Sequence, residues 1–247
     1  MIPSFGRGRT ALFVVSAVFM SLVVTGCGGN NKTPPPPKRA VSVPPSSPPS
    51  YSPDQYTSSF LAARDIGKAF RELPVAVDAL KERQVPLCSL SGAKLEGNPT
   101  ITVRQYSNKS QGRDEIKYAQ LLARYGDGNA AKEAFHSLRS KVEACPAKRS
   151  IPAKRVRKNV LLLAHEDTWK SVESNTPGWT HLRGIEEQTY AATATKFNVL
   201  QFVYDYTLRG NIVIATVYWE RAEPKTSTDP AARRATEVLT KQLQKFG

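Results

Sequence analysis

The stretch FNVLQFVYDYTLRGNIVIATVYWER, residues 197–221, predicts the β-hairpin on which the rest of the fold depends. Gly210-Asn211 suits a two-residue type II′ turn, whose first position needs a positive φ. Such a turn places four pairs of apolar or aromatic side chains on one face: Leu208 with Val213, Tyr206 with Ala215, Tyr204 with Val217, and Phe202 with Trp219. A three-residue loop would divide this set between the two faces, so the pattern itself fixes the register.

The segments around this hairpin predict further antiparallel strands and several helices. Strand patterns cover residues 100–106, 115–125, 160–164 and 180–190. Helical patterns cover residues 60–73, with a possible break at Gly67, then 75–81 and 130–144, and a last helix from Asp229-Pro230. Residues 160–164 read as a short buried strand, 85–99 as irregular chain and 165–178 as a polar connection. Since no β-α-β rhythm is present, the predicted class is α+β, an antiparallel sheet flanked by helices.

The N-terminal residues predict export. Arg7 and Arg9 precede an apolar run that ends in Val24-Thr25-Gly26-Cys27, which is the layout of a secretory signal. The run is short for a transmembrane helix, which needs about 20 apolar residues. Its ending resembles the lipobox of bacterial lipoproteins. That resemblance implies a signal peptide over residues 1–26, cleavage before Cys27 and a diacylglyceryl group on the Cys27 thiol; an ordinary secreted protein and an uncleaved anchor are the alternatives.

Two or more acyl chains, such as palmitate, would hold the protein on the membrane stably, whereas one chain binds only marginally. We therefore expect a lipid-anchored protein on the extracytoplasmic face of the cell membrane. Residues 27–54 are rich in proline, which excludes helix and central strand and favours an extended, disordered tether with a reach of up to roughly 80 Å. A ligand for SH3-like or WW-like domains is the other interpretation of such a segment.

The predicted domain, residues 55–247, is basic. The chain has 35 Lys and Arg and 21 Asp and Glu; five of the cations precede residue 54 and all the acids follow residue 53, which leaves 30 cations against 21 acids from residue 54 onward. This surplus of about nine charges favours anionic partners, such as lipid headgroups, wall polymers or phosphorylated ligands. No nucleic-acid-binding module is present, and an exported protein is not expected to bind nucleic acid.

Two cysteines remain once Cys27 is lipidated. Cys88 and Cys145 form an even pair in an oxidising compartment, which predicts one disulfide; two free buried thiols are the alternative. The bridge would close a loop of about 58 residues and stabilise the fold by about 4 kcal/mol. There is no CxxC pattern and no histidine near either cysteine, so we predict neither a metal site nor a cofactor.

A basic segment follows the second cysteine. Its cations are Lys148, Arg149, Lys154, Arg155, Arg157 and Lys158. It could bind anionic headgroups or wall phosphates, or it could be a solvated loop, as runs of charge usually are.

Several motifs together resemble the PknH-like extracellular sensor domains of actinobacteria. They are the helix running into Cys145-Pro146, Trp179 followed by Leu182-Arg183-Gly184, the run Arg209-Gly210-Asn211-Ile212-Val213-Ile214, and a closing helix. The resemblance covers most of residues 58–247. It implies a curved antiparallel sheet flanked by helices, a cleft for an undefined ligand and no catalysis. Members of this family often have two disulfides, whereas one pair of cysteines is available here.

The candidate ligand-binding residues are Trp179, Arg183, Glu186 and Trp169, with core packing as the alternative for the aromatics; Tyr204 and Trp219 are expected in the core. His165-Glu166-Asp167 is the one cluster with acid–base potential. No GxSxG, HExxH, SxxK or phosphate-loop motif occurs. We therefore expect no enzyme, but a membrane-anchored domain that binds a small ligand or an envelope protein. The alternatives are a structural envelope lipoprotein on anionic lipid or wall surfaces and, less favoured, a hydrolase.

Overall fold

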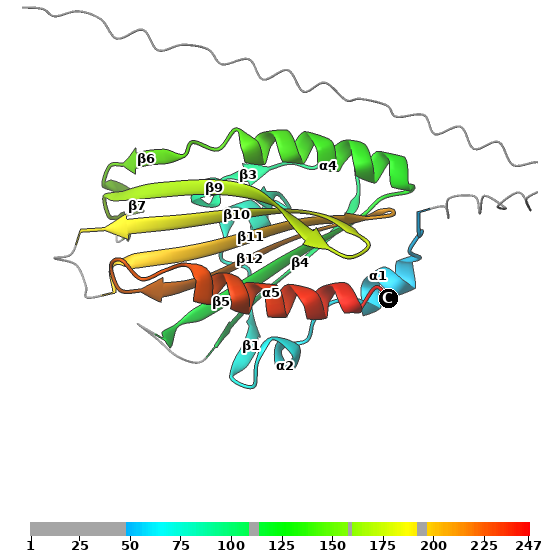
Figure 1. Cartoon of the computed structure of the whole chain (residues 1–247), viewed down its shortest axis with the longest axis horizontal. Helices are drawn as coiled ribbons and strands as arrows, with labels where there is room; N and C mark the ends of the chain where they lie inside the picture. The colour runs from blue at the N-terminus through cyan, green and yellow to red at the C-terminus, as the bar shows by residue number, and fades with distance from the viewer. Residues whose placement is uncertain (1–47, 109–113, 158–159, 192–196) are drawn as a thin grey trace, which may run out of the picture. The chain divides into compact units, whose positions relative to one another are not determined.

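The structure is a computed structural model that describes residues 48–108, 114–157, 160–191 and 197–247. Its centre is an eight-stranded antiparallel sheet with the order β1-β4-β5-β12-β11-β10-β9-β6 (Figure 1). These strands are β1 (Phe70–Leu73), β4 (Thr100–Asn108), β5 (Ile116–Arg124), β6 (Lys148–Ile151), β9 (His165–Thr176), β10 (Trp179–Tyr190), β11 (Val199–Arg209) and β12 (Ile212–Ala222). Two short pairs stand outside this sheet: β2 (Val85–Pro86) with β3 (Gly92–Ala93), and β7 (Lys154–Arg157) with β8 (Val160–Leu162). The predicted α+β class is confirmed.

The central hairpin has the predicted register. Leu208 pairs with Val213 and Phe202 with Trp219, and the two intervening apolar pairs follow the same register. Gly210 has a φ of +56°, the conformation that the first position of a type II′ turn requires and that glycine adopts without steric cost. Since β11 and β12 lie in the middle of the sheet, this turn sets the position of the strands on both sides.

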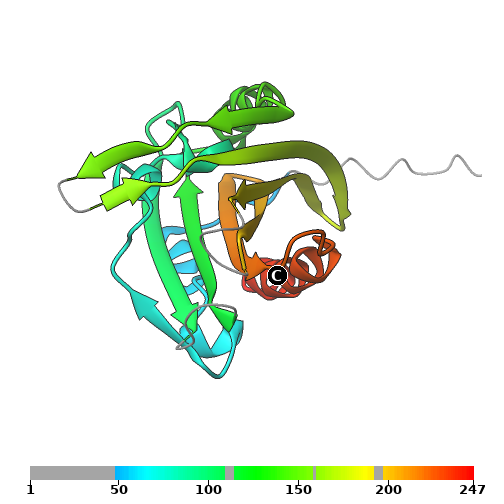
Figure 2. The ribbon, with the colours of Figure 1, turned by 90° about the vertical axis from the view of Figure 1, so that its left-hand side faces the viewer.

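Helices cover both faces of the curved sheet (Figure 2). On one face lies α4 (Gly128–Glu143), with α3 (Asp78–Lys81) and the 3₁₀ turn η1 (Cys88–Leu90). On the other lie α1 (Pro53–Ser58), α2 (Ala63–Ile66) and α5 (Asp229–Gln244). The apolar face predicted for the hairpin packs under α4, through Phe135, Leu138 and Val142. The opposite face is equally buried under α5, although it carries Asp205 and Thr207.

The prediction of one helix over residues 60–73 is wrong. The chain forms only the single turn of α2 and then β1, which pairs with β4 from Phe70↔Asn108 to Leu73↔Gln105. Gly67 separates the two elements, and a Cβ there would lie 2.9 Å from the ring of Phe70. The open edge of β4 offers backbone partners to residues 70–73, and this long-range pairing outweighs the local helical pattern.

Two further predictions need correction. Residues 165–178 are not a polar connection, because they form the long strand β9, whose inward positions include His165, Asp167 and Trp169. Its alternation was hidden because two of these three inward side chains are ionisable. Of the strand predicted over residues 160–164, Val160–Leu162 does form β8, but it is not buried: Leu161 is 56 % exposed, Leu162 36 % and the following Leu163 43 %. The expected turns at 108–113 and 191–195 lie largely outside the described residues.

The folded unit begins before residue 55. Residues Ser46–Gly247 form one compact unit, and Tyr51 is buried against Phe246. The boundary expected at residue 54 therefore falls inside α1, which Ser52 caps. The apolar clusters on both faces of the sheet are built within this unit, so we treat residues 46–247 as a domain that folds by itself. In the described part of the chain, none of the helices is long and apolar enough to span a bilayer.

Candidate functional site

The sheet divides the four predicted ligand-binding residues into two pairs. Trp169 and Glu186 are cross-strand partners on β9 and β10, and they face α4. Trp179 and Arg183 project from the other face of β10, where Trp179 packs with Phe246 and Arg183 bonds to Thr236 of α5. One site cannot contain all four side chains.

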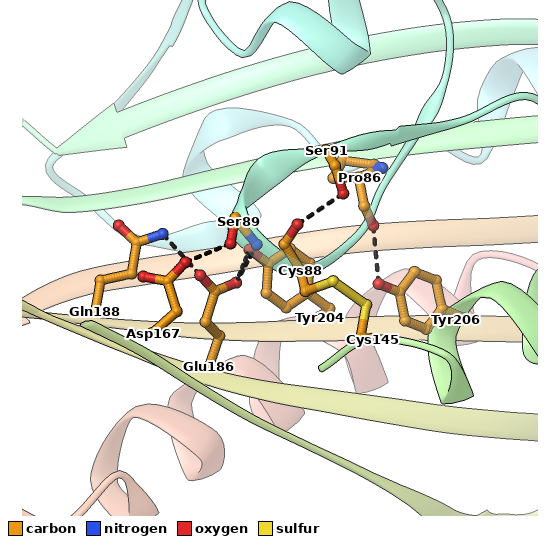
Figure 3. Close-up of a disulfide and its surroundings, with 10 residues drawn as sticks. All are labelled: Pro86, Cys88, Ser89, Ser91, Cys145, Asp167, Glu186, Gln188, Tyr204 and Tyr206. Atoms are coloured by element: carbon orange, nitrogen blue, oxygen red, sulfur yellow. Dashed lines mark hydrogen bonds between the residues drawn. A yellow bond between two sulfur atoms is a disulfide. The ribbon is translucent and has the colours of Figure 1, made fainter. Parts of the chain in front are cut away.

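The predicted disulfide between Cys88 and Cys145 is present, with Cα atoms 6.1 Å apart. It joins η1 to the end of α4 and holds the η1 turn over β10 (Figure 3). Ser89 and Leu90 in this turn have φ values of +52° and +53°, which non-glycine residues rarely adopt. The bridge and the polar contacts below it hold this turn in place.

Glu186 lies directly under this turn and is 1 % exposed. Its Oε2 accepts hydrogen bonds from the backbone N–H of Ser89 (2.8 Å) and from the hydroxyl of Tyr204 (2.7 Å), and its Oε1 accepts one from Gln188 (2.7 Å). Burial, together with the nearby charge of Asp167, raises the pKa of Glu186 above its ordinary value despite these donors. The side chain therefore acts as a fully bonded interior acceptor that fixes η1 on the sheet.

A second buried carboxylate continues this network. The Ser89 hydroxyl donates to Asp167, whose other oxygen lies 3.3 Å from Nε2 of His165. The His165 ring stacks on Tyr190 at 4.6 Å and its Nδ1 bonds to the carbonyl of Leu163 at 2.8 Å. The predicted acid–base cluster is therefore divided, because Glu166 faces outward and pairs with Lys148. Among the described residues, no group of three His, Cys, Asp or Glu side chains is arranged to hold a metal.

The α5 side of β10 carries a hydrogen-bonded chain that the sequence did not reveal. Asp205 Oδ1 accepts from His181 Nε2 at 2.8 Å and from Arg183 Nε at 2.6 Å. Burial alone would raise the pKa of Asp205, but the His181 hydrogen bond and the Arg183 charge hold it below its ordinary value. The ionised carboxylate can only accept, so Nε2 of His181 carries the proton. Nδ1 of His181 then contacts the hydroxyl of Thr176 at 2.7 Å.

Trp179 borders a groove of about 640 Å³ at the end of the sheet where β9 turns into β10 and β11 into β12. One wall comes from α4, with Phe135 and the exposed His136, and the other from the β9–β10 turn. Arg209 lies 5.7 Å from the ring of Trp179 and donates to the carbonyl of Gly247. The groove therefore combines an aromatic floor with cations at its rim.

The side chains that line the groove include cations but no carboxylates. Its lining includes Lys132, Arg139 and Arg209, and it includes neither Asp nor Glu. Arg139 is paired with the exposed Glu173 on β9, whereas Lys132 is exposed on α4. A rim of this kind favours an anionic group, while Trp179, Phe135 and Pro177 of the turn favour an apolar one.

The segment before α1 forms part of the same groove. Pro48 and Pro49 line it, and Tyr51 is fixed by the side chain of Asn211, which accepts from the Tyr51 N–H at 2.8 Å and donates to the Tyr51 carbonyl at 3.2 Å. Asn211 also donates to the carbonyl of Tyr125 at 3.0 Å. The β11–β12 turn thus holds the point at which the predicted tether joins the domain.

A second cavity of about 590 Å³ lies between the start of β5, the end of β12 and the start of α5. Its charged residues have both signs, and Arg234 pairs with Glu220 and contacts the hydroxyl of Tyr218. Because Arg234 and Glu220 neutralise each other, this cavity offers less to a charged ligand than the groove does.

The predicted basic segment forms a projecting edge. Lys148 and Arg149 lie on β6, Lys154 and Arg155 lie on β7, and all four are exposed. Lys158 and the side chain of Arg157 lie outside the described part of the structure, and so does Cys27. The sequence located these cations, but it did not place them beside the exposed leucines of β8.

Comparisons with known proteins find likeness in structure. The sequence matches no family of proteins and no curated protein. The crystal structure of the extracellular domain of PknH from Mycobacterium tuberculosis matches with a TM-score of 0.51 and 11 % identity, over 80 % of this chain and 100 % of that one. A putative uncharacterized protein from Mycobacterium smegmatis matches at a TM-score of 0.31 and 8 % identity, over 76 % and 93 %, which carries no argument. The domain therefore has the fold of the PknH extracellular domain.

Proposed function

We propose that this chain is a lipid-anchored extracytoplasmic binding protein whose domain receives an anionic ligand with an apolar part in the groove beside Trp179. The observation that carries the proposal is the lining of that groove, which brings Lys132 and Arg209 to an aromatic floor without a carboxylate. Cations at a concave apolar site attract and orient an anion. Phosphorylated lipids and anionic wall polymers have this chemistry.

The location and the anchor rest on separate support. The fold is that of an extracellular domain, and the Cys88–Cys145 disulfide fits an oxidising compartment. The lipobox-like Val24-Thr25-Gly26-Cys27 supports acylation of Cys27, and two or more acyl chains would make that attachment long-lived.

We also propose that the domain binds without catalysing a reaction. Thr176, His181 and Asp205 form a hydroxyl–imidazole–carboxylate chain, as in hydrolases. However, Asp205 is shared with the guanidinium of Arg183 at 2.6 Å, and it uses the same oxygen for both partners. This arrangement supports a role in joining β9, β10 and β11 under α5.

The test is a titration of the domain, residues 46–247, with dihexanoyl phosphatidylglycerol below its micellar concentration, followed by tryptophan fluorescence and calorimetry. We expect saturable binding that weakens as salt increases, since the contacts are partly ionic. The dihexanoyl phosphatidylcholine analogue, which has no net charge, should bind at least about fivefold more weakly, as loss of about 1 kcal/mol of charge attraction implies. Equal binding of both lipids at every salt concentration would contradict an anionic site.

The variants Lys132→Gln and Arg209→Gln test the groove directly. Each should weaken binding by about threefold to tenfold, because a rim charge at an interface contributes on the order of 1 kcal/mol. Lys68→Gln, which removes an exposed cation between α2 and β1, is the matched control and should bind as the parent does. If all three variants lose affinity equally, the ligand senses the net charge of the domain and the groove is not the site.

A further inference from the structure

The β7–β8 ribbon carries the most concentrated exposed apolar surface in the described part of the chain. Leu161, Leu162 and Leu163 are exposed there, whereas Val172 is a single exposed hydrophobic residue elsewhere, on β9. Three consecutive exposed leucines are unusual on a soluble domain, since surface apolar residues are normally scattered singly. This surface therefore needs a partner.

Cations stand directly beside these leucines. In the β7–β8 pairing, Lys154 is opposite Leu162 and Arg155 is opposite Leu161. Directly paired residues of an antiparallel ribbon project from the same face, so each face of the ribbon presents one leucine and one cation. Arg149 on the neighbouring β6 is also exposed, which extends the positive charge along this edge, whereas Lys148 beside it is paired with Glu166.

A shallow cavity of about 230 Å³ lies behind the leucines. Its lining joins Leu161–Leu163 to Tyr190 and Leu200, with Arg221 as its charged residue. The apolar surface thus continues from the ribbon onto the ends of β10 and β11, and again a cation borders it.

We propose that the β7–β8 ribbon is a membrane-docking element that inserts Leu161–Leu163 into the interface of an anionic lipid bilayer. Long cationic side chains beside a shallow apolar insertion reach the headgroups while the leucines contact the acyl boundary. Each Lys or Arg near an anionic surface adds about fivefold to the affinity. A second copy of the chain would have to bring further Lys and Arg against these cations, and a hydrophilic wall polymer would leave the leucines in water.

The geometry of the chain allows this docking together with an N-terminal anchor. The ribbon lies at the end of the sheet where β11 begins. The N-terminal segment that leads to Tyr51 joins the domain at the other end of β11, at Asn211. β11 has 11 residues and so spans about 36 Å. Residues 27–47 can reach up to about 70 Å, which is enough to return past the domain to the bilayer.

The experiment is a flotation assay of the domain, residues 46–247, with vesicles of phosphatidylcholine and with vesicles that also hold about 30 mol% phosphatidylglycerol. We expect partitioning onto the anionic vesicles, at least tenfold weaker onto the zwitterionic ones. Equal binding to both, or to neither, overturns the proposal.

Variants separate the apolar and ionic parts. Leu161→Gln with Leu163→Gln should lower partitioning at least tenfold, and Lys154→Gln should lower it about fivefold. Val172→Gln, which replaces a residue 45 % exposed elsewhere on β9, should change nothing. If the double leucine variant still binds as the parent does, attraction is purely ionic and the proposal fails. If it instead turns a dimer into a monomer in sedimentation, the leucines form a self-contact and the proposal also fails.

The full, anchored chain gives an independent measurement. A fluorophore on the thiol of a Leu162→Cys variant should be quenched by brominated acyl chains, whereas one on Ser140→Cys of α4 should not. Equal quenching at both positions overturns the docking geometry. None of the ribbon variants touches the groove beside Trp179, so titration with dihexanoyl phosphatidylglycerol should be unchanged in them, and failure of either proposal can be recognised separately.

Discussion

Arg183 and Glu186 are three residues apart on β10, yet their side chains lie on opposite faces of the sheet and serve separate buried networks. Arg183 bonds to Asp205 under α5, and Glu186 bonds to Ser89 under the disulfide. The Asp205 carboxylate accepts from a guanidinium and an imidazole, while the Glu186 carboxylate accepts only from neutral donors. The two therefore respond to pH in opposite directions.

Glu186→Gln should flatten part of the pH dependence of stability. Burial raises the pKa of Glu186, so its stabilising contribution is complete below the ordinary glutamate pKa and is lost as pH rises through the raised value. We expect the free energy of unfolding of the variant to change less across that window than that of the parent. At neutral pH the two should agree within about 1 kcal/mol, because the Gln188 amide and the Tyr190 hydroxyl can reverse their hydrogen bonds.

Urea titrations at a series of pH values measure the free energy of unfolding of the parent and of Glu186→Gln. Glu187→Gln is the control, since Glu187 lies next in sequence on the opposite face. A parent whose stability increases with pH through that window would show that Glu186 is not the controlling group.

Asp205→Asn should be strongly destabilising. It leaves Arg183 beside a neutral amide in a buried network, and loss of one partner of a buried ion pair costs about 3–5 kcal/mol. The pKa of Asp205 is lowered, so its contribution is present above the ordinary aspartate pKa and is lost as pH falls through the lowered value. The gap between parent and variant should therefore narrow in acid, where both unfold more easily.

Chemical denaturation at a series of pH values measures the difference in free energy of unfolding between the parent and Asp205→Asn. Asp78→Asn, which removes an exposed pair with Lys81, should cost no more than about 1 kcal/mol. A constant difference between Asp205→Asn and the parent down to strongly acidic pH would contradict the assignment.

Removing the disulfide should loosen the η1 turn more than it loosens the sheet. The bridge spans 57 positions of sequence, and the chain-entropy relation gives about 4 kcal/mol for such a loop. In the variant with both Cys88→Ser and Cys145→Ser, hydrogen exchange at the Ser89 amide should become much faster, because the turn with positive φ loses its covalent support. Exchange in β11 and β12 should change only in proportion to the global stability; preferential exposure of those strands would show that the bridge stabilises the sheet itself.

Asn211→Ala should release the start of the domain. Three hydrogen bonds to the Tyr51 and Tyr125 backbones are lost in a buried position, at a cost of about 2–3 kcal/mol. Limited proteolysis should then cut around residues 48–52 in the variant and not in the parent. Asn211→Asp keeps the acceptor for the Tyr51 N–H but turns a carboxylate oxygen toward the Tyr51 and Tyr125 carbonyls in a buried site, so it should be cut at least as fast as Asn211→Ala.

Hydrolysis of p-nitrophenyl acetate checks the non-catalytic proposal. The domain should accelerate the reaction no more than Thr176→Ala or His165→Ala does. An activity that disappears in Thr176→Ala would make the Thr176–His181–Asp205 chain catalytic, and one that disappears in His165→Ala would point to the other network.

The sequence predicted which residues of the central hairpin pair with each other. The alternating pattern, the Gly210-Asn211 turn and the aromatic residues on both strands all indicate the same register there. It failed for β1 and β9 for different reasons. Phe70–Leu73 is helical in local pattern and becomes a strand only because β4 offers an open edge. β9 has the period of a strand, but His165 and Asp167 take inward positions that a pattern of apolar residues cannot reveal.

The four candidate ligand-binding residues lie on two neighbouring strands, but the sequence analysis did not divide them between the two faces of the sheet. Trp179, Arg183, Glu186 and Trp169 all belong to β9 or β10, and a strand alternates faces, so residues 183 and 186 had to separate. Asn211 was assigned only to a turn, and its bonds to Tyr51 span 160 positions of sequence. Contacts of that kind depend on the assembled fold, which no local pattern encodes.

The clamp between Asn211 and Tyr51 also determines how the domain experiences mechanical tension. A pull on the preceding chain is delivered through Tyr51 to the β11–β12 turn, at the middle of the sheet and not at its edge. Force applied there acts along β11 and β12, which pair over 11 positions, and loads many backbone hydrogen bonds together, so the domain should resist unzipping when it is pulled from the segment before Tyr51.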